Sequence, residues 1–181
     1  MLINGREVLL YTPHGSHLYG LATASSDKDF YAVVADRSVN KYGDAKQTIV
    51  NNIDTTVVGY SKFLEMCHKG VPQALEALMS QQATVDNIGF IRENYIIAGS
   101  EVLSTYLRTI KSFTLDEREG KQPKLRRHAV RLAINLNTIM HDGRFNPKLT
   151  VEEINICNRL YTMPLEELKP ELEKVAGYHV F

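Results

Sequence analysis

The stretch that decides the fold is HGSHLYGLATASSDKDFYAV, residues 14–33. It holds a Gly-Ser pair, Gly15-Ser16, then ten residues, and then two acids, Asp27 and Asp29, separated by one lysine. The apolar run that follows is rich in β-branched and aromatic residues, which is typical of a buried strand. Side chains two apart on a strand project to the same side, so we expect the two carboxylates to lie together.

Carboxylates held together repel each other, and a divalent cation relieves that repulsion. Hard oxygen ligands suit Mg²⁺ or Mn²⁺. Gly15 leaves room for close approach, Ser16 offers a hydroxyl and a backbone N–H, and such a pair at a strand-to-helix turn can receive a phosphate. Together these features favour nucleotide chemistry. The alternative is a surface turn, in which Asp-x-Asp beside Ser and Gly is common.

Bulk composition sets few limits on function. The 181 residues are enough for one sizeable domain or two small ones, and Lys plus Arg (21) balances Asp plus Glu (21). Net charge therefore argues neither for nor against a nucleic-acid partner. The two cysteines, Cys67 and Cys157, lack the spacing of a disulfide framework or a zinc site. The chain shows neither a signal peptide nor a membrane span, so we expect a cytoplasmic protein with no membrane partner.

The pattern along the chain changes from strands to helices. Strand-like runs occupy residues 7–12, 29–35 and 47–61, and the last is broken near Asn51-Asn52. After Gly59 the apolar residues recur at helical spacing. We therefore predict an α+β front half and an all-helical back half.

Several residues mark the expected helix ends. Pro72 suits an early position of a helix, and Ser100 could cap the start of another. An apolar stripe from Leu125 to Met140 ends at Asp142-Gly143. Thr150 and Glu153 have the spacing of a capping box, and a last helix is expected to begin near Pro164.

The same residues carry a family resemblance. The Gly-Ser pair, the spacer and Asp-x-Asp resemble the signature of the polymerase-β-type nucleotidyltransferase superfamily. Within it, the chain looks most like the predicted nucleotidyltransferases of the RNA-repair-associated group. The matching segments are Tyr19-Gly20, Ser26-Asp27-Lys28-Asp29, Lys62-Phe63-Leu64, and residues 69–79 and 127–143.

The resemblance implies a fold and a division of the chain. The fold is a nucleotidyltransferase-like mixed β-sheet with flanking helices, followed by an all-helical C-terminal region. Residues 1–85 would form the catalytic core and residues 86–181 the helical region.

The superfamily uses a third carboxylate on a neighbouring strand, and we choose Asp54 because an acid precedes the Lys-Phe-Leu helix in the resembling group. Asp36 and Asp44 are the competitors, but both fall in turn-like sequence. By resemblance, Asp27, Asp29 and Asp54 are the catalytic residues and the ligands of Mg²⁺ or Mn²⁺.

The expected nucleotide-binding residues lie in three places. Gly15 and Ser16 would hold the triphosphate, with Lys62 at the start of the following helix. His128 and Arg131 match the resembling group's helical region. They belong to a basic stretch, residues 121–131, for which a solvated helix face is the alternative.

The activity implied by the resemblance is Mg²⁺-dependent transfer of a nucleoside monophosphate from a nucleoside triphosphate to an acceptor hydroxyl, with release of pyrophosphate. An RNA end is the favoured acceptor because the resembling group is associated with RNA repair. Two alternatives stay open: a catalytically silent nucleotide- or RNA-binding module, and a toxin–antitoxin component that nucleotidylates a protein. The oligomeric state is also open, since a helical back half can pack on itself or on a partner.

Overall fold

A computed structural model describes residues 1–36, 45–51, 53–97 and 99–181. The chain divides into two compact units. The first unit comprises Met1–Lys69, Gln73–Tyr95 and Asn146–Lys148, and the second comprises Gly70–Pro72, Ile96–Phe145 and Leu149–Phe181. The sequence predicts a catalytic core in residues 1–85 and a helical region in residues 86–181. This division by function stays a prediction.

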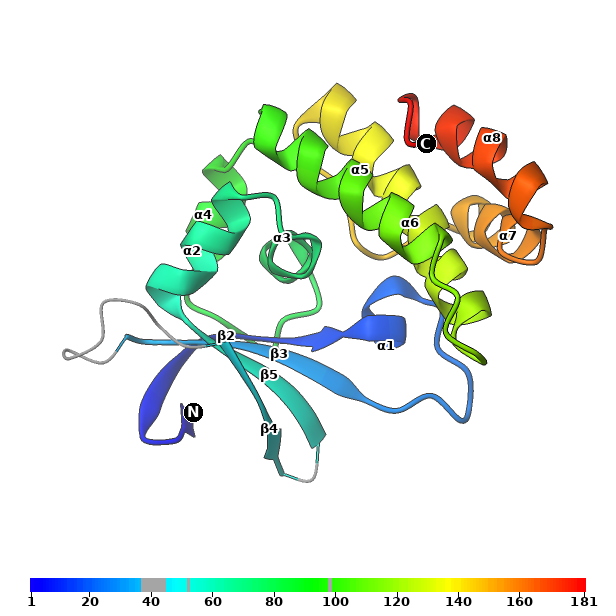
Figure 1. Cartoon of the computed structure of the whole chain (residues 1–181). Helices are drawn as coiled ribbons and strands as arrows, with labels where there is room; N and C mark the ends of the chain where they lie inside the picture. Colours follow the sequence, from blue (N-terminus) through cyan, green and yellow to red (C-terminus); the bar gives the residue numbers. More distant parts are fainter. Residues whose placement is uncertain (37–44, 52, 98) are drawn as a thin grey trace. The chain divides into compact units, whose positions relative to one another are not determined.

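The first unit is built on a mixed sheet (Figure 1). Its strand order is β1-β2-β3-β5-β4, with β6 paired to β2. Strands β3 and β5 run parallel, and the other described pairings are antiparallel. The strands are β1 (Leu2–Ile3), β2 (Arg6–His14), β3 (Asp29–Val34), β4 (Ala45–Val50), β5 (Ile53–Gly59) and β6 (Val85–Asp86).

The expected break in the strand-like run lies between β4 and β5. Asn51 has a φ of 51°, a left-handed conformation that asparagine adopts more readily than most residues. Asn52 lies outside the described residues. Strands β4 and β5 pair from Val50 opposite Ile53, so the two strands adjoin on either side of the break.

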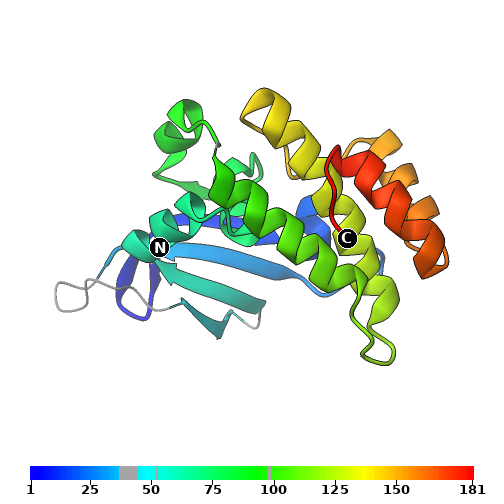
Figure 2. The same ribbon diagram turned by 45° about the horizontal axis from the view of Figure 1, so that its top comes forward.

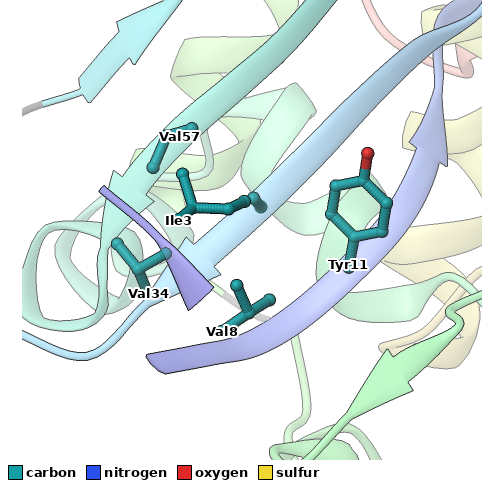
Figure 3. Close-up of a cluster of buried hydrophobic side chains, with 6 residues drawn as sticks. Ile3, Val8, Tyr11, Val34 and Val57 are labelled. Carbon is teal, nitrogen blue, oxygen red and sulfur yellow. The ribbon is translucent and has the colours of Figure 1, made fainter. Parts of the chain in front are cut away.

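One face of the sheet carries an apolar cluster (Figure 3). Alternate residues of β3 contribute Ala32 and Val34, and Val57 comes from the neighbouring β5. Ile3 of β1 joins them because the N-terminal hairpin places it in the same cluster. The full cluster is Ile3, Val8, Tyr11, Ala32, Val34 and Val57.

Helices cover the opposite face (Figure 1). The ring of Tyr31, which points away from Ala32, lies 6.2 Å from the ring of Phe63. The helices of this region are α1 (Gly15–Tyr19), α2 (Tyr60–His68), α3 (Pro72–Met79) and α4 (Gly89–Asn94). Helix α3 begins at Pro72, whose fixed φ and missing N–H suit a first helical position.

The second unit is helical (Figure 2). Its helices are α5 (Ser100–Thr114), α6 (Gln122–Asp142), α7 (Val151–Leu160) and α8 (Leu165–Ala176). Helix α6 packs against the other three, and its Leu132, Leu136 and Ile139 are buried. Within the described residues, no helix is both long and apolar enough to cross a membrane.

The α+β class with a mixed sheet and a helical C-terminal region is confirmed. The expected capping box is also confirmed. The Thr150 side chain accepts from the Glu153 N–H, and the Glu153 carboxylate accepts from the Thr150 N–H. The expected cap at Ser100 is wrong. Gly99 occupies the cap position of α5, and Ser100 is the first helical residue.

Candidate active site

Three strand ends meet at one end of the sheet. Strand β2 ends at His14, which pairs with Asp29 at the start of β3. Asp29 in turn is in register with Asp54 on the parallel strand β5. Residues in register project to the same side of a sheet, so the Asp29 and Asp54 side chains share a face. It is also the face of Tyr31, which the helices cover.

Gly15 lies directly against the Asp29 carboxylate. Its φ of 61° is in the left-handed region. A Cβ added to Gly15 would lie 3.0 Å from Asp29 Oδ2. A side chain there would therefore strain the backbone and displace the carboxylate. This close approach is a physical reason for glycine ahead of Ser16.

Asp27 does not lie on a strand, so that part of the sequence prediction is wrong. It is exposed in the loop that precedes β3, and the strand begins only at Asp29. A turn precedes this loop: the Ser26 N–H donates to the Thr23 carbonyl, and the Ser26 hydroxyl accepts from the Thr23 N–H. Serine and threonine side chains compete in this way with regular secondary structure.

Asp27, Asp29 and Asp54 offer the carboxylate oxygens that suit a divalent ion. Two of them, Asp29 and Asp54, are in register on neighbouring strands. Asp29 is half-buried and Asp54 exposed, so oxygens of both can reach a cation on the shared face. In the described part of the chain, no three Asp, Glu, His or Cys side chains are gathered closely enough to hold a metal. Among the described residues, Asp27, Asp29 and Asp54 therefore do not form a gathered set of three ligands.

The competing acids lie elsewhere. Asp36 follows the far end of β3, where its Oδ2 accepts from the Ser61 N–H at 2.9 Å. Its other oxygen lies 3.9 Å from an Arg6 nitrogen. Asp36 thus fixes the start of α2, and Asp54 is the acid in register with Asp29. Asp44 lies outside the described residues.

Lys62 is engaged within its own helix. Its Nζ lies 2.9 Å from Glu65 Oε2, while Lys69 Nζ lies 2.6 Å from Glu65 Oε1. Hydrogen bonds from Lys69 and Lys62 lower the pKa of Glu65 to about 2. A phosphate contact by Lys62 would require its ammonium to leave this exposed cluster.

His128 and Arg131 lie on α6 in the second unit. Arg131 is buried, with 4% of its surface exposed, and the His128 ring lies 6.3 Å from the Phe113 ring. Arg127 donates to Asn158 Oδ1 at 2.8 Å. Exposure thus falls along the basic stretch toward Arg131, and phosphate binding by this stretch stays a prediction.

Sequence reasoning missed two features of the first unit. Ile49 of the edge strand β4 lies opposite Asp54 and is 70% exposed, which places an apolar side chain next to that carboxylate. Glu76 on α3 is fully buried and accepts a hydrogen bond from Tyr19. Local sequence around Glu76 gives no signal of this contact, because Tyr19 lies 57 positions earlier.

Comparison with known families identifies the group. The model of the RlaP family, described as the RNA repair pathway DNA polymerase beta family, matches residues 3–167. The chain belongs to this family. The match spans the Gly-Ser pair, all three acids and the helices through the start of α8.

Membership in the RNA repair pathway DNA polymerase beta family confirms the resemblance seen in the sequence. It indicates a polymerase-β-like nucleotidyltransferase, a class whose members generally use divalent metals and a nucleoside triphosphate. No curated protein matches the chain.

Proposed function

We propose that the protein is a Mg²⁺- or Mn²⁺-dependent nucleotidyltransferase that moves a nucleoside monophosphate from a nucleoside triphosphate to an acceptor hydroxyl. An RNA end is the acceptor we favour, since the family is named for an RNA repair pathway. The observation that carries the proposal is the register of Asp29 with Asp54 beside the Gly15-Ser16 pair.

The acids would hold and orient the reacting groups. Asp29 and Asp54, joined by Asp27 from its loop, would bind the divalent ions. Such ions neutralise the triphosphate and lower the pKa of the acceptor hydroxyl. Asp54 would accept the hydroxyl proton as the acceptor oxygen bonds to the α-phosphorus. The bond from the α-phosphorus to the bridging oxygen breaks, and pyrophosphate leaves with that oxygen.

The Gly15-Ser16 pair would hold the phosphate tail. The Ser16 hydroxyl and backbone N–H groups can donate to phosphate oxygens. Gly15 has no side chain, so a phosphate could approach beside the Asp29 carboxylate. Lys62 would add a positive charge after releasing Glu65. In this proposal residues 1–85 form the catalytic core.

His128 and Arg131 are proposed as further phosphate ligands, for a triphosphate or for an RNA backbone. Family membership supports this assignment, since the match extends through α6. If Arg131 binds phosphate, Arg131→Ala should weaken binding and reduce its dependence on salt concentration.

The test is transfer of label from each α-labelled triphosphate, with Mg²⁺ or Mn²⁺, to RNA and protein acceptors. We expect transfer to RNA that disappears in Asp29→Asn. Asp36→Asn is the matched control, because Asp36 follows the opposite end of β3 and contacts the start of α2. Label transfer that persists in Asp29→Asn would show that the assignment of this active site is wrong. Labelling of protein alone would indicate the toxin-type activity, and binding without transfer would indicate a silent module.

A further inference from the structure

A buried polar contact joins α1 to α3. The Tyr19 hydroxyl donates to Glu76 Oε2 at 2.6 Å, and the two residues are 3% and 0% exposed. A carboxylate is costly to bury unless hydrogen bonds replace its water. The contact is therefore specific, and it holds the last residue of α1 in place against α3.

A second contact holds the same end of α1. Gln82, just beyond α3, donates from Nε2 to the Leu18 carbonyl at 3.1 Å. Helix α1 has only five residues, and so short a helix is not stable by itself. Glu76 and Gln82 thus hold its C-terminal end, together with the packing of the buried Leu18.

Helix α1 also reaches the proposed active site. Its first two residues are Gly15 and Ser16. His17 Nε2 lies 3.3 Å from the carbonyl oxygen of Ser26, the residue before Asp27. One short helix therefore connects α3 to the Gly-Ser pair and to the loop that carries Asp27.

We infer that Tyr19 and Glu76 are positioning residues for nucleotidyl transfer: their hydrogen bond sets the place of α1, and α1 sets the place of the Gly15-Ser16 pair and of the Asp27 loop. The inference rests on the proposed function for its catalytic consequence. The link from Glu76 through Tyr19 to the position of α1 rests on the structural contacts alone. Glu76 would act through Tyr19 and, being fully buried, would not touch the substrate.

The chain offers a matched control for this link. Tyr31 is also fully buried and lies on β3 in the same unit. Within the described residues its hydroxyl has no hydrogen-bond partner. Tyr19→Phe and Tyr31→Phe therefore delete the same atom from the same kind of side chain, but only Tyr19→Phe breaks a bond. Glu76→Gln keeps an acceptor oxygen for Tyr19, and Glu76→Met removes it.

The experiment combines kinetics with hydrogen exchange of the full chain. For Tyr19→Phe we expect kcat/KM for the triphosphate to fall by about 10- to 100-fold, the cost of a small misplacement. Amide exchange should accelerate in residues 15–20 and 22–28, while β5 keeps its protection. Glu76→Met should behave likewise. Tyr31→Phe and Glu76→Gln should retain most of the activity and the protection.

Two results would overturn the inference. One is equal behaviour of Tyr19→Phe and Tyr31→Phe in both measurements. The other is exchange that rises evenly over the first unit, because this indicates a general loss of stability. If the wild-type chain transfers no nucleotide, the proposed function fails instead. The exchange measurement then still decides the link, with local acceleration supporting it and no acceleration rejecting it.

Discussion

The two units use polar side chains in different ways. In the first unit, buried hydrogen bonds join distant segments: Thr12 with Ser80, and Tyr19 with Glu76, 68 and 57 positions apart. In the second unit, the buried Thr114 hydroxyl donates to a carbonyl of its own helix, and the contacts that join helices, Arg127 with Asn158 and Asn137 with Val175, are exposed or half-buried. Long-range polar contacts fix relative positions, whereas local ones only complete a helix. Substitutions in the first unit should therefore impair catalysis first, and those in the second should impair stability first.

The largest effect is expected in the helical core of the second unit. Leu136 is fully buried on α6. Leu136→Ala should lower the free energy of unfolding by about 2–5 kcal/mol, because it removes buried apolar surface and leaves a cavity. Denaturant unfolding measures this, with the exposed Lys124→Ala on the same helix as control. A loss no larger than that of the control would show that α6 is not the core of its unit.

A second prediction separates activity from stability in the first unit. Gly15→Ala should reduce transfer by about 100-fold, equivalent to about 2.7 kcal/mol, because the new Cβ would displace the Asp29 carboxylate. Gly5→Ala is the matched control: Gly5 has a φ of 72° and no atom within 4 Å of an added Cβ. Both variants should lose similar stability, about 1–2 kcal/mol for the left-handed backbone. Equal transfer rates in the two would refute the close approach.

The smallest effect compares the buried cysteine of each unit. Burial raises the pKa of Cys67 to about 12 and that of Cys157 to about 11, where Arg131 and Arg127 partly offset the rise. A thiol whose pKa is raised by folding stays protonated in the folded state while the unfolded chain ionises. Its contribution to stability is complete below the unfolded pKa of about 9 and is lost as pH rises toward the folded pKa.

Above a pH of about 9, the buried Cys67 thiol should therefore lower the free energy of unfolding by up to about 1.4 kcal/mol for each pH unit. This loss should continue to a higher pH for Cys67 than for Cys157. Unfolding free energies of the wild type, Cys67→Ala and Cys157→Ala at pH 8, 9 and 10 measure how much of the alkaline loss each thiol causes. The alkaline loss should shrink in both variants. If Cys67→Ala shows the same alkaline loss as the wild type, its thiol is not buried in solution.

Local patterns predicted much of the fold. The apolar run after Asp29 and the β-branched run after Asp54 gave the two central strands, and the family resemblance chose Asp54 from three acids. Helix spacing and capping chemistry located α6, α7 and α8, since a turn ended by Gly143 or begun by Thr150 depends on neighbouring residues alone.

Other features depend on contacts that local sequence does not encode. Asp27 lies off the strand, because β2 ends at His14 opposite Asp29 and the chain then enters α1. The partner of Tyr19 became apparent only when α3 was placed beside α1. Arg131 looked like a surface cation by composition, but it is buried on α6.

The central claim is that Asp29 and Asp54 hold a divalent ion. Mn²⁺ titration followed by electron paramagnetic resonance, with a non-hydrolysable triphosphate present, tests it most directly. We expect the wild type and Asp36→Asn to bind Mn²⁺ equally, and Asp29→Asn and Asp54→Asn to bind it more than about tenfold more weakly. Unchanged Mn²⁺ affinity in both of the latter variants would contradict the claim.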